Sequence, residues 1–323
     1  MEFSHTPVLL NEVLENLNLK KNGIYVDCTL GGAGHSSKIL EKIESGLLVG
    51  FDKDQDAIDA STTRLEKICN VISTCNLENL SGKNCLIVKD DFKNSPEVLK
   101  KLGITEIDGI LIDLGVSSHQ LDTAERGFSF KKEAPLDMRM DKTQLLTAKE
   151  IVNTYSEEEL KKLLKEYGEE EFAFSIAKNI VKAREIKEIE TTLELNEIVE
   201  NSMPKKVVFS RGGASKKVFQ ALQIEVNGEL NLLNETIENL THLLKKCGRI
   251  AIISFHSLED RIVKNVFKDL ATGCVCPKNF PICVCNHKAE IEIITRKPIV
   301  ASEKEQQENS RSTCAKLRVA EKL

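Results

Sequence analysis

The segment that most constrains the fold of this chain is a strand, a turn of small residues and a helix. Ile24–Val26 has the composition of a strand, and the glycine-rich turn Leu30–Gly34 follows it. An amphipathic helix is predicted over Ser36–Ile43 and a second strand over Leu47–Phe51. This order is that of a parallel βαβ unit, in which the turn lets a ligand approach the backbone closely.

Strands and helices continue to alternate along most of the chain, and the 41% hydrophobic and 29% charged residues are typical of a globular protein. Further strands are predicted at Cys85–Val88, Ile107–Ile112, Ile250–Ser254, Ile291–Thr295 and Lys316–Ala320, and further helices from Thr6-Pro7 and at Ala57–Ile68, Pro96–Leu102 and Asp260–Leu270. The pattern predicts an α/β fold with a mostly parallel, doubly wound sheet.

One stretch interrupts this alternation. From about Thr143 to Met203 the chain is rich in Glu and Lys, has helical periodicity and shows no strand. We therefore predict an inserted helical domain over residues 141–205, between two parts of one α/β domain at 1–140 and 206–323. The polar segment Lys297–Ser312 is predicted to be a loop.

The acids at the strand ends indicate the kind of ligand. Asp52 ends the second strand, where a carboxylate can accept hydrogen bonds from both hydroxyls of a ribose. The third glycine of a dinucleotide fingerprint is missing after Gly32 and Gly34, and no phosphate-binding loop is present. S-adenosylmethionine has no phosphates and fits this turn best, although a glycine turn by itself can also merely let a helix pack on a strand.

Two other residues near this edge have a structural and a functional interpretation. Asp113 ends the strand Ile107–Ile112 and either caps the next turn or faces the cofactor or the reacting centre. Phe92 either packs on an adenine ring or belongs to the core. The sequence alone leaves both alternatives open.

Longer motifs resemble a known family, the bacterial S-adenosylmethionine-dependent methyltransferases that modify N4 of a cytosine in the decoding region of 16S ribosomal RNA. The matching segments run nearly end to end: His5–Leu9, Gly31–Ser36, Asp108–Ile110, Asp113–Ser118, Glu125–Phe130, Pro135–Asp141, Phe219–Leu222, Ile253–Arg261 and Ala315–Arg318.

The resemblance implies a class I, Rossmann-like methyltransferase fold with an inserted helical domain. It also implies S-adenosylmethionine as cofactor and 16S ribosomal RNA as partner, and we expect that RNA to be met within a small-subunit particle. Because cytosine N4 is a poor nucleophile, we expect a catalytic acceptor near its N–H groups, either Asp113 or a backbone carbonyl of Leu114–Ser117. The cofactor-binding residues that the resemblance implies are Ala33, Gly34, His35, Asp52, Phe92, Asp113 and Gln120.

The chain departs from the family pattern at three places. Ala33 stands where the family usually has Gly, so we expect a negative φ or a relaxed turn there. His119 stands where Pro is usual, and Asn309-Ser310-Arg311 where Asn-Pro-Arg is usual. These changes affect local loop geometry rather than the predicted reaction.

An RNA partner requires a local basic surface, because 45 Lys plus Arg against 50 Asp plus Glu give a net charge of −5. The segment Lys205–Lys217 has five basic residues, no acid and one aromatic residue, Phe209. It is the best candidate for phosphate binding, and a solvated loop is the alternative. No signal sequence or membrane-spanning stretch is apparent, which predicts a cytoplasmic protein with reduced thiols.

The cysteines and His256 offer possible metal or nucleophile sites. Cys274, Cys276, Cys283 and Cys285 form two Cys-x-Cys pairs, whereas zinc fingers usually have a Cys-x₂₋₄-Cys spacing. We favour reduced thiols over zinc and predict no metal ligand. His256 precedes Ser257, a predicted helix N-cap, and methyl transfer to nitrogen needs neither an enzyme nucleophile nor a metal.

Two other functions fit parts of the same sequence. A nicotinamide-dependent oxidoreductase would use the same sheet edge and ribose-binding acid. A non-catalytic RNA-binding or ribosome-assembly protein would retain the fold without the chemistry, although Asp52, Asp113 and the glycine turn are all present. The oligomeric state is left open.

Overall fold

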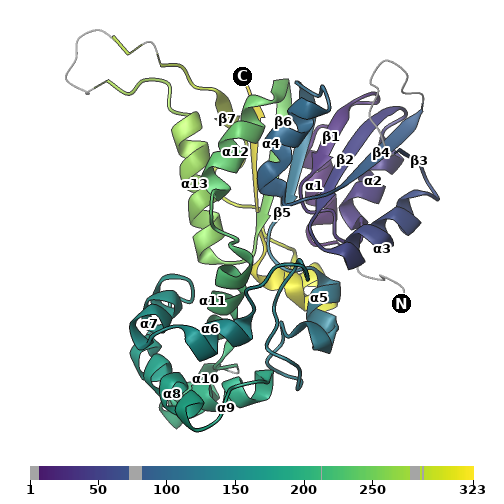
Figure 1. The fold of residues 1–323 in the computed structure, drawn as a ribbon. Coiled ribbons are helices and arrows are strands. Elements are labelled where there is room, and N and C mark those ends of the chain that lie inside the picture. Colours follow the sequence, from purple (N-terminus) through teal and green to yellow (C-terminus); the bar gives the residue numbers. More distant parts are fainter. Residues whose placement is uncertain (1–6, 73–81, 212, 277–283, 286) are drawn as a thin grey trace. The chain divides into compact units, whose positions relative to one another are not determined.

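The computed structural model describes residues 7–72, 82–211, 213–276, 284–285 and 287–323 (Figure 1). The chain forms two compact units: Met1–Gly115 together with Leu232–Leu323, and Val116–Asn231. The second unit contains the predicted insertion, but it is wider at both ends than residues 141–205.

An eight-stranded sheet forms the centre of the first unit. In spatial order its strands are β3 (Asn70–Ile72), β4 (Lys83–Lys89), β2 (Gly46–Asp52), β1 (Ile24–Asp27), β5 (Ile107–Asp113), β6 (Leu244–Ser254), β8 (Lys316–Lys322) and β7 (Ile291–Ile293). The strands from β3 to β6 pair in parallel, and β8 is antiparallel to both β6 and β7. This confirms the predicted mostly parallel α/β sheet.

Helices cover both faces of this sheet. They are α1 (Leu10–Asn16), α2 (Gly34–Lys42), α3 (Gln55–Leu65), α4 (Ser95–Lys101), α12 (Leu233–His242), α13 (Ser257–Leu270) and α14 (Glu303–Glu308), with short 3₁₀ turns η2 (Phe92–Asn94) and η4 (Ser310–Cys314). Figure 1 shows α4, α12 and α13 on one face and α1, α2 and α3 on the other. The strand order reverses between β1 and β5, and ligands of doubly wound sheets bind at such a reversal.

Several elements differ from the sequence prediction. β3 was not predicted, because it is three residues long and pairs only with β4 at the sheet edge. The segment predicted as a loop contains α14 and η4. Ser302 caps α14, and Glu305 in its first turn accepts a 2.8 Å hydrogen bond from the distant Leu9 N–H. A long-range anchor of this kind leaves no local signal in the sequence.

Two helix starts also differ. α1 begins at Leu10 after a left-handed Leu9 (φ 54°) rather than at Pro7, and the predicted cap Thr6 lies outside the described residues. α13 is capped by His256 instead of Ser257, and Glu259 accepts a hydrogen bond from the His256 N–H in return. An imidazole nitrogen therefore takes the place that the hydroxyl was predicted to fill.

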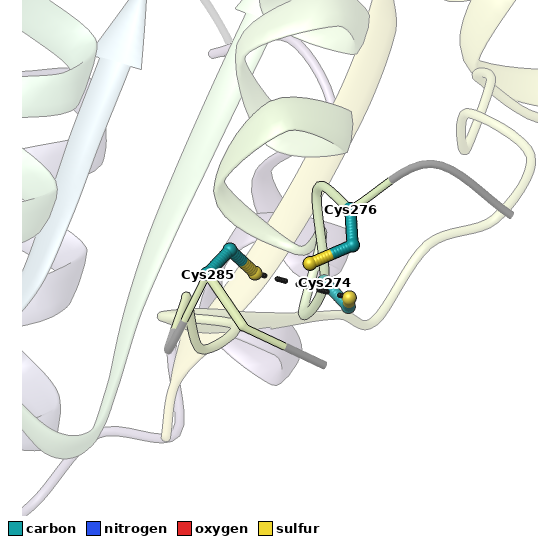
Figure 2. A group of neighbouring side chains, drawn as sticks. All are labelled: Cys274, Cys276 and Cys285. Carbon is teal, nitrogen blue, oxygen red and sulfur yellow. Dashed lines mark hydrogen bonds between the residues drawn. The ribbon is translucent and has the colours of Figure 1, made fainter. Parts of the chain in front are cut away.

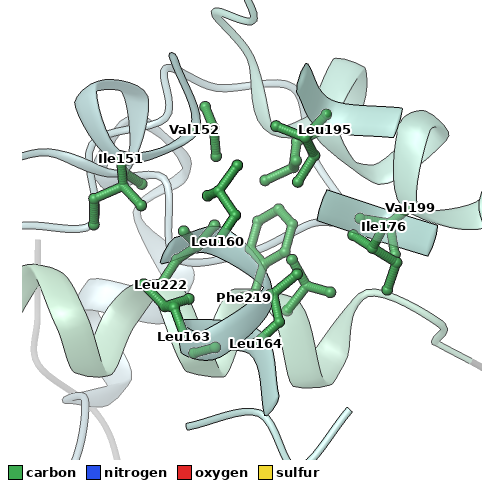
Figure 3. Close-up of a cluster of buried hydrophobic side chains, with 14 of the residues drawn as sticks. Ile151, Val152, Leu160, Leu163, Leu164, Ile176, Leu195, Val199, Phe219 and Leu222 are labelled. Carbon is green, nitrogen blue, oxygen red and sulfur yellow. The ribbon is translucent and has the colours of Figure 1, made fainter. Parts of the chain in front are cut away.

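The second unit is helical: α5 (Ser118–Asp122), η3 (Ala124–Arg126), α6 (Ala148–Thr154), α7 (Glu157–Glu166), α8 (Ala173–Ile186), α9 (Thr192–Asn201), α10 (Lys205–Arg211) and α11 (Lys216–Asn227). Ser156 and Thr191 form the predicted capping boxes of α7 and α9. Figure 3 shows side chains from α6, α7, α8 and α9 around Phe219 and Leu222 of α11.

This core explains why the unit is wider than predicted. Phe219 and Leu222 lie beyond residue 205, and Phe128 and Leu136 lie before residue 141, yet all four are buried in the same cluster. The Asn227 side chain also bonds the backbone of Met138 and Met140. Hydrophobic packing therefore assigns both flanks to the helical unit, whereas composition alone placed them in the α/β domain. None of the described helices combines the length and apolar character needed to cross a bilayer.

Candidate cofactor site

Three acids end three neighbouring parallel strands of the first unit. Asp52 ends β2, Asp27 ends β1 and Asp113 ends β5. Because β1 lies between β2 and β5 in the sheet, the three carboxylates gather at one edge, at the reversal of the strand order. The alternation of strands and helices predicted this edge, and the structure brings Asp52 and Asp113 together there as expected.

Asp52 is tied to the glycine turn. One of its oxygens accepts a 2.8 Å hydrogen bond from the Gly31 N–H, and the other accepts a 2.9 Å bond from the Asp54 N–H. A carboxylate has about four acceptor positions, so both oxygens retain capacity for ribose hydroxyls. Burial raises the pKa of Asp52 to about 6, against the lowering effect of these two backbone bonds.

Asp27 is a member of this site that the predicted residue set omits. It is 2% exposed and accepts hydrogen bonds from the Ser36 hydroxyl (2.5 Å) and the Thr29 N–H (3.1 Å). Burial raises the pKa of Asp27 to about 6, and its charge helps to raise the pKa values of Asp52 and Asp113. Its place at a strand end before the turn was visible in the sequence, but its burial was not.

Asp113 lies opposite His35. The Asp113 N–H donates a 2.7 Å hydrogen bond to the Thr29 hydroxyl, and its Oδ2 lies 3.8 Å from Nδ1 of His35. Burial is the main cause that raises the pKa of Asp113 to about 8, and Asp27 and Glu259 add to it. The Oδ1 atom is buried and has no hydrogen-bond partner within the described part of the protein, which leaves an acceptor for a bound ligand.

His35 is neutral at pH 7, because burial lowers its pKa to about 4. Its Nε2 lies 3.0 Å from the Val8 carbonyl and must be the protonated nitrogen, since a carbonyl can only accept. Nδ1 therefore presents a lone pair toward Asp113, and the pair is not an ion pair at this pH. While Asp113 is ionised the two groups form no hydrogen bond, and a contact between His35 and the cofactor stays a prediction.

The start of α2 has an unexpected backbone conformation. Ala33 has φ 56°, so the negative φ expected for this residue is wrong. The left-handed conformation costs an L-residue roughly 1–2 kcal/mol, and the turn holds it although a methyl group is present. A Cβ on Gly34 would lie 2.5 Å from Cγ of Pro7, so this glycine permits close packing. The first amides of α2 lack intrahelical acceptors and can bind an anion such as a cofactor carboxylate.

The last two predicted cofactor residues, Phe92 and Gln120, lie in different units of the protein. Phe92 starts η2, just after β4, and is half-buried beyond the same edge as Asp52. Gln120 belongs to the helical unit, where its side chain accepts a 2.9 Å hydrogen bond from the Ser117 N–H and closes the capping box of α5. A contact between Gln120 and the cofactor stays a prediction.

A doubly wound sheet with acids at its strand ends and no phosphate-binding loop is compatible with the class of S-adenosylmethionine-dependent methyltransferases. The chain belongs to the MraW methylase family, whose family model matches residues 2–323. The class I methyltransferase fold expected from the sequence is thereby confirmed, together with the resemblance that implied it.

Similar proteins match over the whole chain. It is 50% identical to "Ribosomal RNA small subunit methyltransferase H" of Finegoldia magna and 50% identical to the protein of that name from Clostridioides difficile, with 100% of both chains covered in each comparison. A solved rRNA methylase from Streptococcus thermophilus covers 97% of this chain and 93% of its own at 11% identity, with a TM-score of 0.38. That low score adds no argument, and the fold rests on the sheet topology and the family.

S-adenosylmethionine is the cofactor of this methylase family, and the residues present fit it. The unpartnered Oδ1 of Asp113 offers an acceptor, and the carboxylates of Asp27 and Asp52 complement the positive charge of the sulfonium and amino groups. Asp52 suits the ribose, and the start of α2 suits the methionine carboxylate.

Proposed function

We propose that this methyltransferase transfers a methyl group from S-adenosylmethionine to N4 of a cytosine in the decoding region of 16S ribosomal RNA. The observation that supports this most is the 50% identity, over the full length of both chains, to proteins named as methyltransferases of small-subunit ribosomal RNA. The specific base and atom are those that the resemblance of the sequence motifs to the family implies.

The cofactor supplies an electrophilic methyl group, so the protein mainly needs to hold the accepting nitrogen in line with it. Cytosine N4 is a weak nucleophile because its lone pair is delocalised into the ring. In our proposal Asp113 accepts a hydrogen bond from the N4 amino group and favours a pyramidal nitrogen. The target base must leave its stack to reach the cofactor.

The helical unit offers the surface for the flanking RNA. Lys205, Lys206 and Lys216 are exposed, and Phe209 is 91% exposed in the middle of α10. Exposed aromatic side chains among cations bind single-stranded RNA by base stacking and phosphate contacts. The segment is a helix over Lys205–Arg211 rather than the solvated loop that was the alternative, and this helix presents Lys205, Lys206 and Phe209. Lys216 begins the next helix, α11.

Not every basic residue of this segment is available for RNA. Arg211 forms a 2.8 Å ion pair with the fully buried carboxylate of Glu170, and Lys217 donates a 2.7 Å hydrogen bond to the Glu169 carbonyl. These two side chains fasten α10 and α11 to the neighbouring loop. The proposed phosphate contacts therefore fall mainly to the three exposed lysines.

The proposal is tested by product analysis. Purified protein is incubated with methyl-labelled cofactor and, separately, with free 16S ribosomal RNA, a precursor particle and the finished small subunit. The RNA is digested to nucleosides and analysed by mass spectrometry. We expect labelled N4-methylcytidine from one or more substrates. Label only in another nucleoside contradicts the assignment of the base or atom, and no transfer to any substrate favours the non-catalytic alternative.

Two further predictions belong with this proposal. We expect a small-subunit particle rather than free RNA to be the better substrate, and we expect the protein to act in the cytoplasm. The same assay ranks the three substrates. Titration with a nicotinamide dinucleotide and with S-adenosylmethionine separates a methyltransferase from the oxidoreductase alternative, because only the proper cofactor should bind.

A further inference from the structure

Three cysteine sulfurs converge in the segment between α13 and β7. Cys274 and Cys276 follow the end of α13, and Cys285 lies later in the same segment, before β7. Figure 2 shows the side chain of Cys285 directed toward Cys274. The sulfur atoms of Cys274, Cys276 and Cys285 all lie within 4.8 Å of one another. Residues eleven positions apart have thus been brought to one point by the fold of this segment.

The spacing of these sulfurs matches a metal site better than a disulfide. The Sγ atoms of Cys274 and Cys285 are 3.8 Å apart. Bonded sulfurs would be about 2.05 Å apart. Four ligands placed tetrahedrally at a Zn–S distance of about 2.3 Å are separated by about 3.8 Å. We propose that Cys274, Cys276 and Cys285 bind Zn²⁺ through three thiolates.

The chemical surroundings support this assignment. The Val284 N–H donates a 3.4 Å hydrogen bond to Sγ of Cys276, the kind of backbone contact that stabilises a sulfur ligand. Thiolates are soft ligands that select Zn²⁺ over hard ions such as Mg²⁺. Cys274 is exposed and the other two are partly exposed, so an ion can enter from solvent. Binding converts three S–H groups to thiolates and releases their protons to solvent.

In the described part of this segment, apolar packing contributes little to holding the chain together. The Glu290 N–H donates a 2.8 Å hydrogen bond to the Leu270 carbonyl and closes the base of the excursion. Beyond that base, Val275 and Val284 are 60% and 68% exposed, so little apolar burial holds the described part together. A metal ion would join its two arms. Three sulfurs leave one coordination position for a further ligand, and Cys283, the fourth cysteine noted in the sequence, lies outside the described residues.

The sequence spacing alone favoured reduced thiols, because Cys-x-Cys pairs depart from the usual finger spacing. The folded segment changes this interpretation, since the three sulfurs come from both pairs and lie within 4.8 Å of one another. The 3.8 Å between Cys274 and Cys285 is the separation that a tetrahedral ion requires. The site shares no residue with the proposed cofactor site, so the two are tested independently.

The experiment uses the full-length protein, stripped with a chelator under reducing conditions and reloaded with Zn²⁺. Bound metal is counted by elemental analysis, and affinity is measured by competition with a chromophoric indicator. Single variants Cys274→Ser, Cys276→Ser and Cys285→Ser are compared with the control Cys247→Ser, which removes another exposed thiol, located in β6. Circular dichroism and S-adenosylmethionine binding check that each variant is folded.

We expect one Zn²⁺ per wild-type chain and an unchanged control. Each of the three variants should lose roughly a hundredfold or more in zinc affinity, because every thiolate ligand contributes a share of the binding free energy. Co²⁺ should replace Zn²⁺ with the absorption of tetrahedral cobalt thiolate. The proposal is overturned if reduced wild-type protein binds no stoichiometric zinc, or if the three variants bind it as tightly as the control. Isolation of a Cys274–Cys285 disulfide as the native form would also overturn it.

Discussion

The acidic edge of the sheet and the basic surface of the helical unit differ in how we propose that they bind charged ligands. At the edge, backbone and hydroxyl donors hold the carboxylates of Asp27 and Asp52, whereas Oδ1 of Asp113 has no partner among the described residues. Burial raises the pKa values of all three acids. On α10 the lysines project into solvent around the exposed Phe209. A single change in a desolvated group is therefore expected to have a large effect, whereas exposed cations act collectively through screened contacts.

The largest effect is expected for Asp113→Asn. The change keeps the size of the side chain but removes the carboxylate that we propose accepts from cytosine N4, so turnover should fall by roughly a hundredfold or more. Methyl transfer to the small subunit measures this, with Asp59→Asn on the exposed face of α3 as a matched control. Turnover of the Asp113 variant within about twofold of wild type would remove Asp113 from the mechanism.

The same variant tests the pKa of Asp113. The raised pKa, about 8, means that the empty site is mostly protonated at neutral pH. A cationic cofactor favours the carboxylate, so affinity should rise between pH 6 and 8 by at most about tenfold per unit for each proton released. Asp113→Asn should lose most of this rise. Calorimetry in buffers of different ionisation enthalpy detects the released proton, and a pH-independent wild-type affinity would refute the assignment.

The next largest effect is expected from replacing Lys205, Lys206, Lys216 and Lys217 together by Gln. Each lost phosphate contact should flatten the log–log salt dependence of RNA binding by about 0.7. Since Lys217 bonds the Glu169 carbonyl, we expect the three exposed lysines to account for most of the change. Filter binding over a salt series gives the slope. An unchanged slope would mean that RNA is held elsewhere, with Arg311, Lys316 and Arg318 as the next candidates.

A smaller effect on the same surface is expected for Phe209→Ala. Loss of one stacking platform should weaken RNA binding by about 1–3 kcal/mol while the salt slope stays as it is. Ile186→Ala removes an apolar side chain of similar exposure, 89% against 91%, from another helix of the unit. If both variants bind RNA like the wild type, Phe209 takes no part in binding.

The smallest effect is expected for Ala33→Gly, which relieves backbone strain and removes one buried methyl group. Glycine removes the cost of a left-handed residue, roughly 1–2 kcal/mol, and loses about 0.8 kcal/mol of methyl burial. The free energy of unfolding should therefore rise by up to about 1 kcal/mol. Urea denaturation measures it, and a clear loss of stability would show that the buried methyl group matters more than the backbone.

The two regions also differ in how far the sequence predicts them. Asp52 and Asp113 were found because strand ends and glycine turns follow local rules, and the strand order then brings such ends together. Three features of the edge depend on the folded surroundings, which no local pattern encodes. They are the hydrogen-bonded burial of Asp27, the left-handed conformation of Ala33 and the neutral charge state of His35.

In the helical unit the sequence predicted the basic residues but not their scaffold. No apolar stripe marks Lys205–Arg211 as a helix, so the sequence does not predict α10. Its Arg211 pairs with Glu170, which is far away in sequence. The flanks of the unit were missed for the same reason: Phe128 and Phe219 look like any core residues until the fold shows which core they share.

The assignment of the cofactor to the acidic edge is tested most directly by calorimetry. S-adenosylmethionine is titrated into three proteins: the wild type, Asp52→Ala and the quadruple lysine variant. Removing the acceptor that we assign to the ribose should weaken binding by about 1.5–3 kcal/mol, or roughly tenfold to a hundredfold, because hydrogen bonds to a charged group are lost. The lysine variant should match the wild type. Equal affinities for the wild type and Asp52→Ala would contradict the assignment of the cofactor to the acidic edge.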